Sequence, residues 1–372
     1  MYFSFTDEQK LLKESVDRFL ENEYPFDTRR AISTSDAGFS DEMWGKFAEL
    51  GWLGLGISDE LGGLGVSAVE TSIVMEGLGH ACAVEPYATT LAIGATVVSG
   101  SGNAHAQALL SGVAEGKTKL ALAVAEPQSR FNLANVETTA TATGVGFRLS
   151  GKKSVVFDGE AADHLIVVTR TSGNSRDPHG LSLFLVDTDQ VERRGFRTID
   201  GRRAAEITID CEIAGDRLLG EEDAGFTLLQ RGVDAGIVAI CAEAVGAMKY
   251  LHDATLEYLR TRTQFGQPLA SFQALQHRVV DMFVAYELSR SMAYMAAVRS
   301  NDSEAVRRKA VSAAKVQIGQ AGRHIGEEAI QLHGGMGMTD ELPVGHYFKR
   351  LTMIDRMFGD VDHHLAAVAA TA

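Results

Sequence analysis

Cysteine and long apolar runs are both scarce in this sequence of 372 residues. The three cysteines, Cys82, Cys211 and Cys241, are odd in number and far apart, which excludes a disulfide framework and a cysteine-based zinc site and suits a reducing cytoplasm. No charge-free apolar run approaches the roughly 18 residues that a membrane span needs. The N-terminus is polar and amphipathic, so we expect no signal peptide, no membrane partner and a cytoplasmic location.

Positive charge is also in deficit. The chain has 35 Lys and Arg against 49 Asp and Glu, a formal net charge of −14. A nucleic acid requires a basic face, and no Lys/Arg-rich run provides one locally, so we exclude nucleic acid as a partner. With 45% hydrophobic and 23% charged residues, the composition is that of a globular protein, and the length allows roughly two or three domains.

Several catalytic motifs are missing. There is no His-Glu-x-x-His, no P-loop and no Gly-x-Ser-x-Gly, so hydrolase, nucleotide-triphosphatase and metal-site interpretations have no support. The glycines between Gly51 and Gly65 do not match the dinucleotide-binding spacing and instead predict a turn-rich loop. The function must therefore be sought in other patterns.

Hydrophobic periodicity divides the chain into three parts. The capping-box form of Thr6 to Gln9 opens a helical segment. From about residue 119, short runs rich in β-branched residues alternate with turns, which predicts an antiparallel sheet or a small barrel and not a βαβ array. Helical periodicity returns from Phe226 to the end, with breaks near Pro268 and Pro343. We predict an α+β chain of three parts: an N-terminal helical domain (1–118), a central antiparallel β domain (119–225) and a C-terminal helical domain (226–372).

Two C-terminal motifs end predicted long helices. One extends from Arg260 to Leu269 and contains Gly266 and Pro268, and the other extends from Gln331 to Gly337 and contains three glycines. Each is compatible with an ordinary glycine-capped helix end. Each is also compatible with an Arg side chain and exposed backbone that converge on a phosphate-bearing ligand.

With these motifs, the chain resembles the acyl-CoA dehydrogenase family over essentially its whole length. The other residues that support the resemblance are Gly51-Trp52-Leu53-Gly54, Glu60 to Gly65, Ala125-Glu126-Pro127 and Gly151-Lys152-Lys153. The resemblance implies a helical N-terminal domain, a central β domain and a C-terminal four-helix bundle (226–372), assembled into dimers or tetramers. It also implies an FAD enzyme that removes hydrogens from Cα and Cβ of an acyl-CoA thioester. A carboxylate takes the α-proton, the flavin takes the β-hydride, and an electron-transfer flavoprotein accepts the electrons.

The resemblance also assigns residues that contact FAD. In the family, these residues contact the FAD of the neighbouring subunit. Arg262 matches the arginine at the FAD pyrophosphate. The positions that match contacts to the ADP half are Gln264, Phe265, Leu269, Phe272, Gln331, Gly334 and Gly335.

The flavin and substrate side departs from the family. The two positions at which family members carry the catalytic glutamate are Gly359 and Gly236 here. The threonine expected before Glu-Pro is Ala125, and the aromatic-x-Thr segment at the flavin is Val155-Val156-Phe157. The serine-rich turn is Gln128 to Phe131. The chain thus retains the groups for a partner's FAD and lacks several that its own flavin would need.

The leading hypothesis is therefore a base-lacking subunit of a heteromeric acyl-CoA dehydrogenase. It resembles the small subunits that act on pimeloyl-CoA or on steroid side-chain or ring acyl-CoA substrates in lipid or steroid catabolism, paired with a homologous catalytic subunit. An alternative is a self-sufficient homotetramer that uses Asp360 as its base, although Asp360 is also placed as a helix N-cap. Asp234 and Glu243 match no family base and are expected to be solvated or paired, and Glu126 to be structural.

Two further alternatives stay open. The chain could be a flavin-free scaffold that stabilises a partner. It could also be a flavin monooxygenase of the same fold, although no residue favours that activity.

Overall fold

A computed structural model describes residues 5–65 and 67–370. Packing divides the chain into two units, each assembled from separate stretches. The helical unit comprises Met1–Ala31, Ala68–Ala83 and Ile237–Ala372, and the sheet unit comprises Ile32–Ser67 and Val84–Gly236. The predicted sequence of helices, then strands, then helices is confirmed. The predicted boundaries at 118/119 and 225/226 stay predictions.

The N-terminal part of the helical unit begins as its capping box predicts. Helix α1 (Asp7–Glu23) has Thr6 as N-cap, and both reciprocal bonds between Thr6 and Gln9 are present. It is followed by α2 (Phe26–Thr34) and later by α4 (Ala68–His80). A Cβ added at Gly77 of α4 would lie 2.3 Å from Val16 Cγ1, so the glycine lets α4 pack closely against α1.

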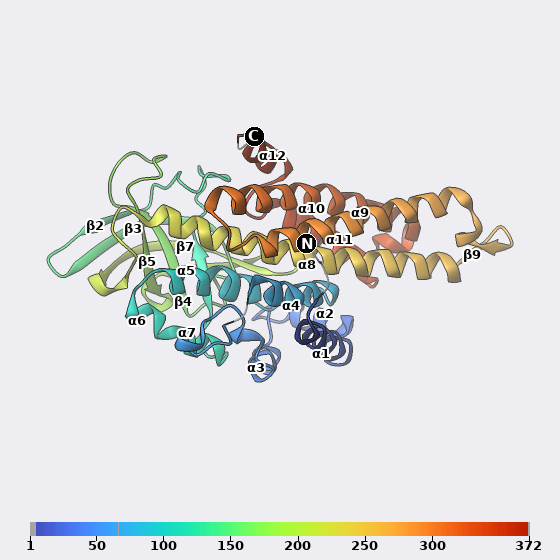
Figure 1. Cartoon of the computed structure of the whole chain (residues 1–372), viewed down its shortest axis with the longest axis horizontal. Coiled ribbons are helices and arrows are strands. Elements are labelled where there is room, and N and C mark those ends of the chain that lie inside the picture. The colour runs from blue at the N-terminus through green and yellow to red at the C-terminus, as the bar shows by residue number, and fades with distance from the viewer. Residues whose placement is uncertain (1–4, 66, 371–372) are drawn as a thin grey trace. The chain divides into compact units, whose positions relative to one another are not determined.

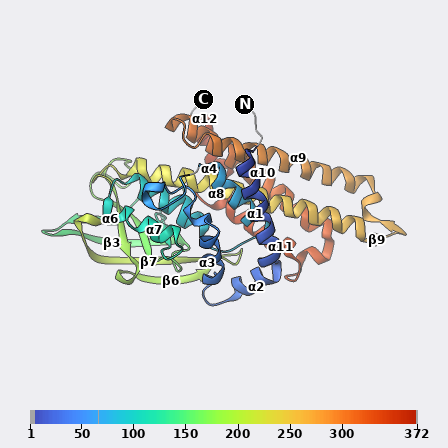
Figure 2. The same cartoon turned by 60° about the horizontal axis from the view of Figure 1, so that its bottom comes forward.

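The C-terminal helices form the bulk of the helical unit. They are α8 (Gly225–Thr261), which belongs to this unit from Ile237 onward, α9 (Gln273–Val298), α10 (Glu304–His333), α11 (Pro343–Arg356) and α12 (Val361–Ala369). The ribbons of α8, α9 and α10 lie alongside one another in both views (Figures 1 and 2). The helical periodicity predicted from Phe226 to the end, with breaks near Pro268 and Pro343, is therefore confirmed.

The sheet unit contains an eight-stranded sheet in the order β6-β7-β3-β2-β4-β5-β8, with β1 paired to β4. The strands are β1 (Leu120–Ala123), β2 (Thr139–Ala142), β3 (Gly146–Phe157), β4 (His164–Arg170), β5 (Leu181–Asp187), β6 (Glu192–Arg197), β7 (Arg203–Ala214) and β8 (Leu218–Leu219). Their inward side chains form a buried apolar core that includes Leu149, Leu165 and Phe184. The α+β fold class is confirmed.

One detail of the predicted sheet is wrong. The sheet is mixed, because β4 is parallel to both β1 and β2, whereas the other pairs are antiparallel. The β2–β3 hairpin intervenes between β1 and β4, so the chain reverses direction twice before β4 begins. Strand β6 was not predicted, because its sequence ERRGFR is mostly charged; it is an edge strand beside β7 (Figure 2).

Short helices complete the sheet unit. They are α3 (Asp41–Glu49), the 3₁₀ turns η1 (Trp52–Gly54) and η2 (Asp59–Leu61), the π-helical η3 (Ala88–Ala95), α5 (Thr96–Gly100), α6 (Ala104–Gln107) and α7 (Leu109–Ala114). The short 3₁₀ turns η4 (Thr188–Gln190) and η5 (Gly215–Arg217) connect strands. The glycine-rich segment from Gly51 is a turn-rich loop, as predicted, with positive φ at Gly51, Gly56, Gly62 and Gly65.

Two kinds of feature are absent from the described residues. Over residues 5–65 and 67–370, no helix is long and apolar enough to cross a membrane. Within the same part of the chain, no three His, Cys, Asp or Glu side chains lie where they could share a metal ion.

Candidate functional site

The first predicted motif forms a hairpin at the end of α8. Strands β9 (Thr263–Gln264) and β10 (Gln267–Pro268) pair antiparallel, and the 3₁₀ turn η6 (Leu269–Ser271) leads into α9. The two-residue loop has φ of 54° at Phe265 and 79° at Gly266, as a type I′ hairpin requires. A phenylalanine with left-handed backbone is strained, and such strain gathers at functional sites. The hairpin projects beyond the helix ends (Figure 1).

The side chains of this hairpin are turned to solvent. Phe265 is 90% exposed and has an edge-to-face contact with Phe272 at 6.1 Å between ring centroids. Arg262 O accepts a hydrogen bond from Leu269 N at 2.9 Å, which closes the hairpin. No residue in the described part of the chain accepts a hydrogen bond from the Arg262 guanidinium. An exposed aromatic ring and an exposed guanidinium in the same hairpin are groups available to a ligand or a partner.

The second motif lies at the same end of the bundle. Helix α10 ends at His333, and Gly334 has a φ of 60° before the 3₁₀ turn η7 (Gly334–Met338). The His333 ring stacks on Tyr258 of α8 at 4.4 Å, and Tyr258 O accepts from Arg262 N at 2.8 Å. Tyr258, which the sequence analysis did not single out, therefore joins the two motifs.

The open backbone of the second motif fits a large ligand. A Cβ added at Gly334 or Gly335 would meet no atom within 4 Å, so both glycines border open space. Gln331 is exposed on the last turn of α10. An Arg side chain, an aromatic ring and bare glycine backbone are groups that suit a diphosphate and a purine. The residues present thus fit the ADP half of FAD, and their contacts with FAD stay a prediction.

The turn between α11 and α12 contains Gly359, where the resemblance predicts the position of the family's catalytic glutamate. Phe358 has a φ of 58° and Gly359 a φ of 121°, so the backbone here is left-handed at two successive residues. Asp360 is the N-cap of α12, as the cap interpretation predicted: its Oδ1 accepts from His363 N at 3.1 Å. Its Oδ2 accepts from Arg356 Nη1 at 2.9 Å.

These contacts stabilise the ionised form of Asp360. The hydrogen bond from His363 N, and then the Arg356 charge, hold the pKa of this carboxyl below its usual value. A base for the α-proton must be free to approach the substrate, and both oxygens of Asp360 already have partners. The role of Asp360 as a base stays an alternative that no contact in the helical unit favours.

No side chain fits at Gly359 without a rearrangement. An added Cβ would lie 2.5 Å from His363 Cδ2 and 2.7 Å from His364 Nε2. The His364 ring lies within hydrogen-bonding distance of Ser312 Oγ and of Phe358 O, both at 3.2 Å. Its pKa falls to about 3 because it is buried and lies near Lys315. The two histidines therefore occupy the space in which a side chain at residue 359 would begin.

A buried lysine fixes the same turn. Lys315 of α10 donates to Gly359 O at 2.7 Å and to Asp355 O at 2.9 Å. Burial lowers the pKa of this lysine to about 8. Lys315 was missed by the sequence analysis; the signal was a single lysine among the small apolar residues of α10.

Two carboxylates on α8, Asp234 and Glu243, are buried. Glu243 accepts from Arg350 Nε and Nη2, both at 2.7 Å, and has no exposed side-chain surface. The expectation that Glu243 is a paired residue is confirmed. Asp234 is 6% exposed, so of the two states expected for it, solvated or paired, its burial excludes the solvated one. Gly236, the second family position for a base, lies between them in the sequence without a side chain.

In the sheet unit, Glu126 is structural, as expected. Its Oε1 accepts from Lys153 Nζ at 2.7 Å, and backbone amides of Glu137 and Thr138 donate to the same carboxylate. Burial raises the pKa of Glu126, but the Lys153 charge and these hydrogen bonds outweigh it and bring the pKa to about 2. Burial lowers the pKa of Lys153 to about 8. The pair connects the loop after β1 to β3.

Beside this pair, Ala125 and the segment Val155 to Phe157 lack the hydroxyl group that the resemblance predicts at each for flavin contacts. Ala125 contributes only its carbonyl, which accepts from Ser154 N at 2.9 Å. Val155 is 36% exposed on β3, where the family has an aromatic residue. The register of β3 against β7 shifts between Lys153 and Val156, so this segment bulges. Residues that would hold a flavin ring are thus fewer than those that would hold the ADP half.

Comparisons with known proteins cover nearly the whole chain. Models of the N-terminal, middle and C-terminal domains of acyl-CoA dehydrogenases match residues 6–117, 121–211 and 223–372. The probable acyl-CoA dehydrogenase YngJ of Bacillus subtilis is 29% identical over 92% of both chains. The caffeyl-CoA reductase-Etf complex subunit CarC of Acetobacterium woodii is 26% identical over 94% of this chain and 93% of its own.

A solved structure matches to a similar extent. A variant of the Tcur3481-Tcur3483 steroid ACAD has a TM-score of 0.89 and 28% identity, over 98% of this chain and 97% of its own. The three domain models, in order and together, account for both units of the structure. The chain belongs to the acyl-CoA dehydrogenase family, whose members are FAD-dependent oxidoreductases.

Proposed function

We propose that this chain is the base-lacking subunit of a heteromeric, FAD-dependent acyl-CoA dehydrogenase. A homologous catalytic subunit supplies the glutamate base and the flavin face, and this chain completes the FAD site of that partner. The complex desaturates an acyl-CoA at Cα and Cβ in the cytoplasm and passes electrons to an electron-transfer flavoprotein.

The observation that carries the proposal is the environment of Gly359. At the family's base position, the backbone is left-handed and two histidines occupy the adjoining space. Asp360, the nearest carboxylate, is a helix cap paired with Arg356. General base catalysis typically contributes about 10²–10⁴-fold to a rate, so a site without a base is nearly silent.

The bundle end supports the other half of the proposal. Arg262, Phe265 and the glycine turn are exposed at one end of the helical unit, where the resemblance places contacts to a neighbour's cofactor. FAD, when bound, supplies the hydride acceptor. The residues of this chain would hold its diphosphate and adenosine and keep water from that half of the cofactor.

The names of two similar proteins support the partner and substrate classes that we propose. One similar structure is a steroid ACAD named for two proteins, Tcur3481 and Tcur3483, and one similar relative is a subunit of a complex with Etf. We infer a second, homologous chain, an electron-transfer flavoprotein as acceptor, and a bulky ring-bearing acyl-CoA as the first substrate class to assay. A dicarboxylyl-CoA such as pimeloyl-CoA is the second class.

The test is the flavin content of the protein alone and of the complex. The chain is purified alone and after co-expression with a homologous chain that carries the catalytic glutamate, and flavin absorbance is measured per chain. We expect almost no FAD alone and one FAD per pair of chains. Arg262→Ala should remove FAD from the complex, whereas Arg260→Ala, an exposed arginine at the end of α8, should not.

Two outcomes would count against the proposal. About one FAD per chain in the protein alone would favour the self-sufficient homotetramer and direct attention to Asp360→Asn kinetics. A complex whose flavin content is unchanged by Arg262→Ala would favour the flavin-free scaffold.

A further inference from the structure

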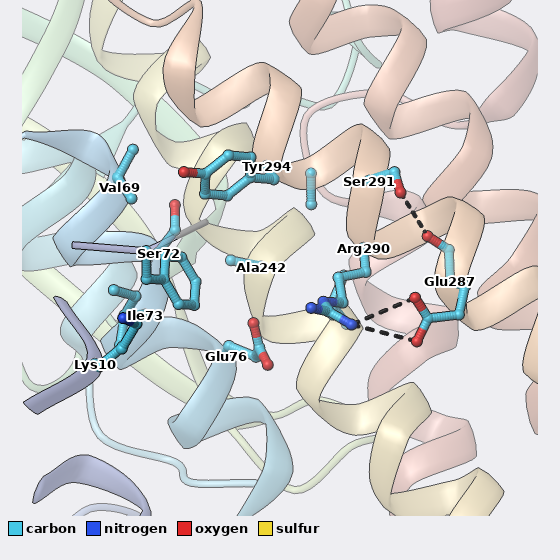
Figure 3. A pocket seen from close by; sticks show the side chains of 13 residues that line it. Lys10, Val69, Ser72, Ile73, Glu76, Ala242, Glu287, Arg290, Ser291 and Tyr294 are labelled. Carbon is cyan, nitrogen blue, oxygen red and sulfur yellow. Dashed lines mark hydrogen bonds and ion pairs between the residues drawn. The ribbon is translucent and has the colours of Figure 1, made fainter. Parts of the chain in front are cut away.

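A cavity of about 400 Å³ lies within the helical unit, between α1, α4, α8 and α9. It is separate from the motifs discussed above and shares no residue with the predicted FAD contacts. Its size lies in the range of small-molecule sites, which are roughly 300–1,000 Å³. Figure 3 shows the side chains that border it.

One part of the cavity is apolar and preformed. Its wall is made by Val69 and Ile73 of α4 and by Ala242 and Val245 of α8, all of them buried. The rings of Phe5 and Tyr294 meet edge to face at 5.7 Å and border the same space. Aliphatic walls with aromatic rings favour a hydrocarbon chain or an alicyclic ring, because contact with them removes apolar surface from water.

The other part of the cavity is polar and contains an arginine with spare donors. Arg290 of α9 binds Glu287 through Nη1 alone, at 3.3 Å to each carboxylate oxygen (Figure 3). Charge-assisted bonds are usually about 2.7–2.9 Å long, so this contact is loose. Among the described residues, none accepts from Nε or Nη2 of Arg290. These two nitrogens lie on one edge of the guanidinium and can donate two parallel hydrogen bonds to a carboxylate.

The formal charges around the cavity balance without a ligand. Lys10 and Arg290 oppose Glu76 and Glu287, and Glu76 Oε1 also lies 3.5 Å from Lys13 Nζ. Glu76 and Glu287 thus each have a cationic neighbour, whereas Arg290 has unfilled donors. This asymmetry favours an anionic head group over an ammonium group.

We propose that this cavity is a second ligand site, which binds an amphipathic monocarboxylate with its apolar part against Val69, Ile73 and Val245 and its carboxylate on Arg290. The ligand is a free carboxylate and not a CoA thioester, and its binding requires neither FAD nor a partner chain. It is independent of the proposed dehydrogenase role, because no residue in it belongs to the predicted FAD contacts or to the turn at Gly359.

The experiment is calorimetric titration of the purified full chain with decanoate. Decan-1-ol and decylamine, which have the same chain with a neutral or cationic head, are titrated as comparisons. Arg290→Gln removes the charge, and Ala242→Leu fills the apolar wall. Arg323→Gln is the matched control, because Arg323 pairs with Glu327 on α10 in a similar way and does not line the cavity. Circular dichroism confirms that each variant is folded.

We expect saturable binding of about one decanoate per chain, weakened at least about tenfold by Arg290→Gln, as loss of a charge-assisted bond predicts. Ala242→Leu should also weaken binding, and Arg323→Gln should not. If Ala242→Leu fails to fold, Arg290→Gln decides the question. The proposal is overturned if decanoate does not saturate, if Arg290→Gln binds as well as the wild type, or if decylamine binds more tightly than decanoate.

Discussion

Replacement of Gly359 by alanine should destabilise the protein strongly. Two effects combine, since the backbone φ is 121° and the new Cβ would lie 2.5 Å from the His363 ring and 2.7 Å from the His364 ring. A left-handed backbone costs an ordinary residue about 1–2 kcal/mol. Overpacking of a well-packed site typically costs about 1–3 kcal/mol. Together we expect about 2–5 kcal/mol of lost unfolding free energy.

Urea unfolding followed by far-UV circular dichroism measures this loss, and a second variant tests the contribution of His364. Gly359→Ala/His364→Ala removes the His364 contacts but keeps the backbone strain and the His363 contact at 2.5 Å, so it should be less destabilised than the sum of the single variants by about 1 kcal/mol, the lower end of the overpacking cost. Gly45→Ala is the control: it lies inside α3 with no atom within 4 Å of the new Cβ. It should gain about 0.5–1 kcal/mol.

The reasoning would be refuted if Gly359→Ala were within about 0.5 kcal/mol of the wild type, the usual range of harmless surface changes. A functional corollary concerns Gly359→Glu. Because the space for a side chain is taken, this substitution should not create a second active site in the heteromeric complex. A dehydrogenase rate per complex that doubles on Gly359→Glu would contradict the proposed origin of the silent site.

Two further predictions concern buried charges. Glu243→Gln leaves the Arg350 guanidinium buried beside a neutral side chain and should cost about 3–5 kcal/mol of unfolding free energy. The double variant Glu243→Gln/Arg350→Met should recover part of this loss. An equal loss of unfolding free energy in both variants would contradict the prediction. Because the pKa of His364 is about 3 against 6.5 when unfolded, the unfolded chain binds more protons between these values. The free energy of unfolding should therefore fall as the pH drops from 6.5 towards 3, by up to about 1.4 kcal/mol per pH unit. Unfolding midpoints measured against pH should fall less steeply in His364→Asn than in the wild type.

Local sequence rules predicted most of the elements of this fold. The Thr6 capping box, the strands with β-branched residues and the glycines that end α8 and α10 each act through near neighbours in the chain, so the sequence shows them directly. The mixed pairing of β4 could not be predicted in this way, because strand direction depends on where distant segments meet. Strand β6 was missed because its charged residues suit an edge and not a core.

The candidate site likewise has one part that local sequence predicts and one part that depends on distant residues. The motifs around Arg262 and Gly334 are contiguous in sequence, and the structure joins them through the Tyr258–His333 stack. The environment of Gly359 is different, because Lys315 and His364 reach it from α10 and α12. A sequence shows that residue 359 has no side chain. Only the packing shows that no side chain has room there.

The charged edge strand β6 has a consequence for assembly. A sheet edge with unpaired backbone groups can recruit the same strand of another copy. In β6, Arg193 donates to carbonyl oxygens of Gly159, Glu160 and Ala162, and Arg197 donates to Thr34 and Ser35. A second copy approaching this edge would bring its own arginines against these and would have to displace them. The arginines of β6 therefore hinder strand pairing between two copies at this edge of the sheet.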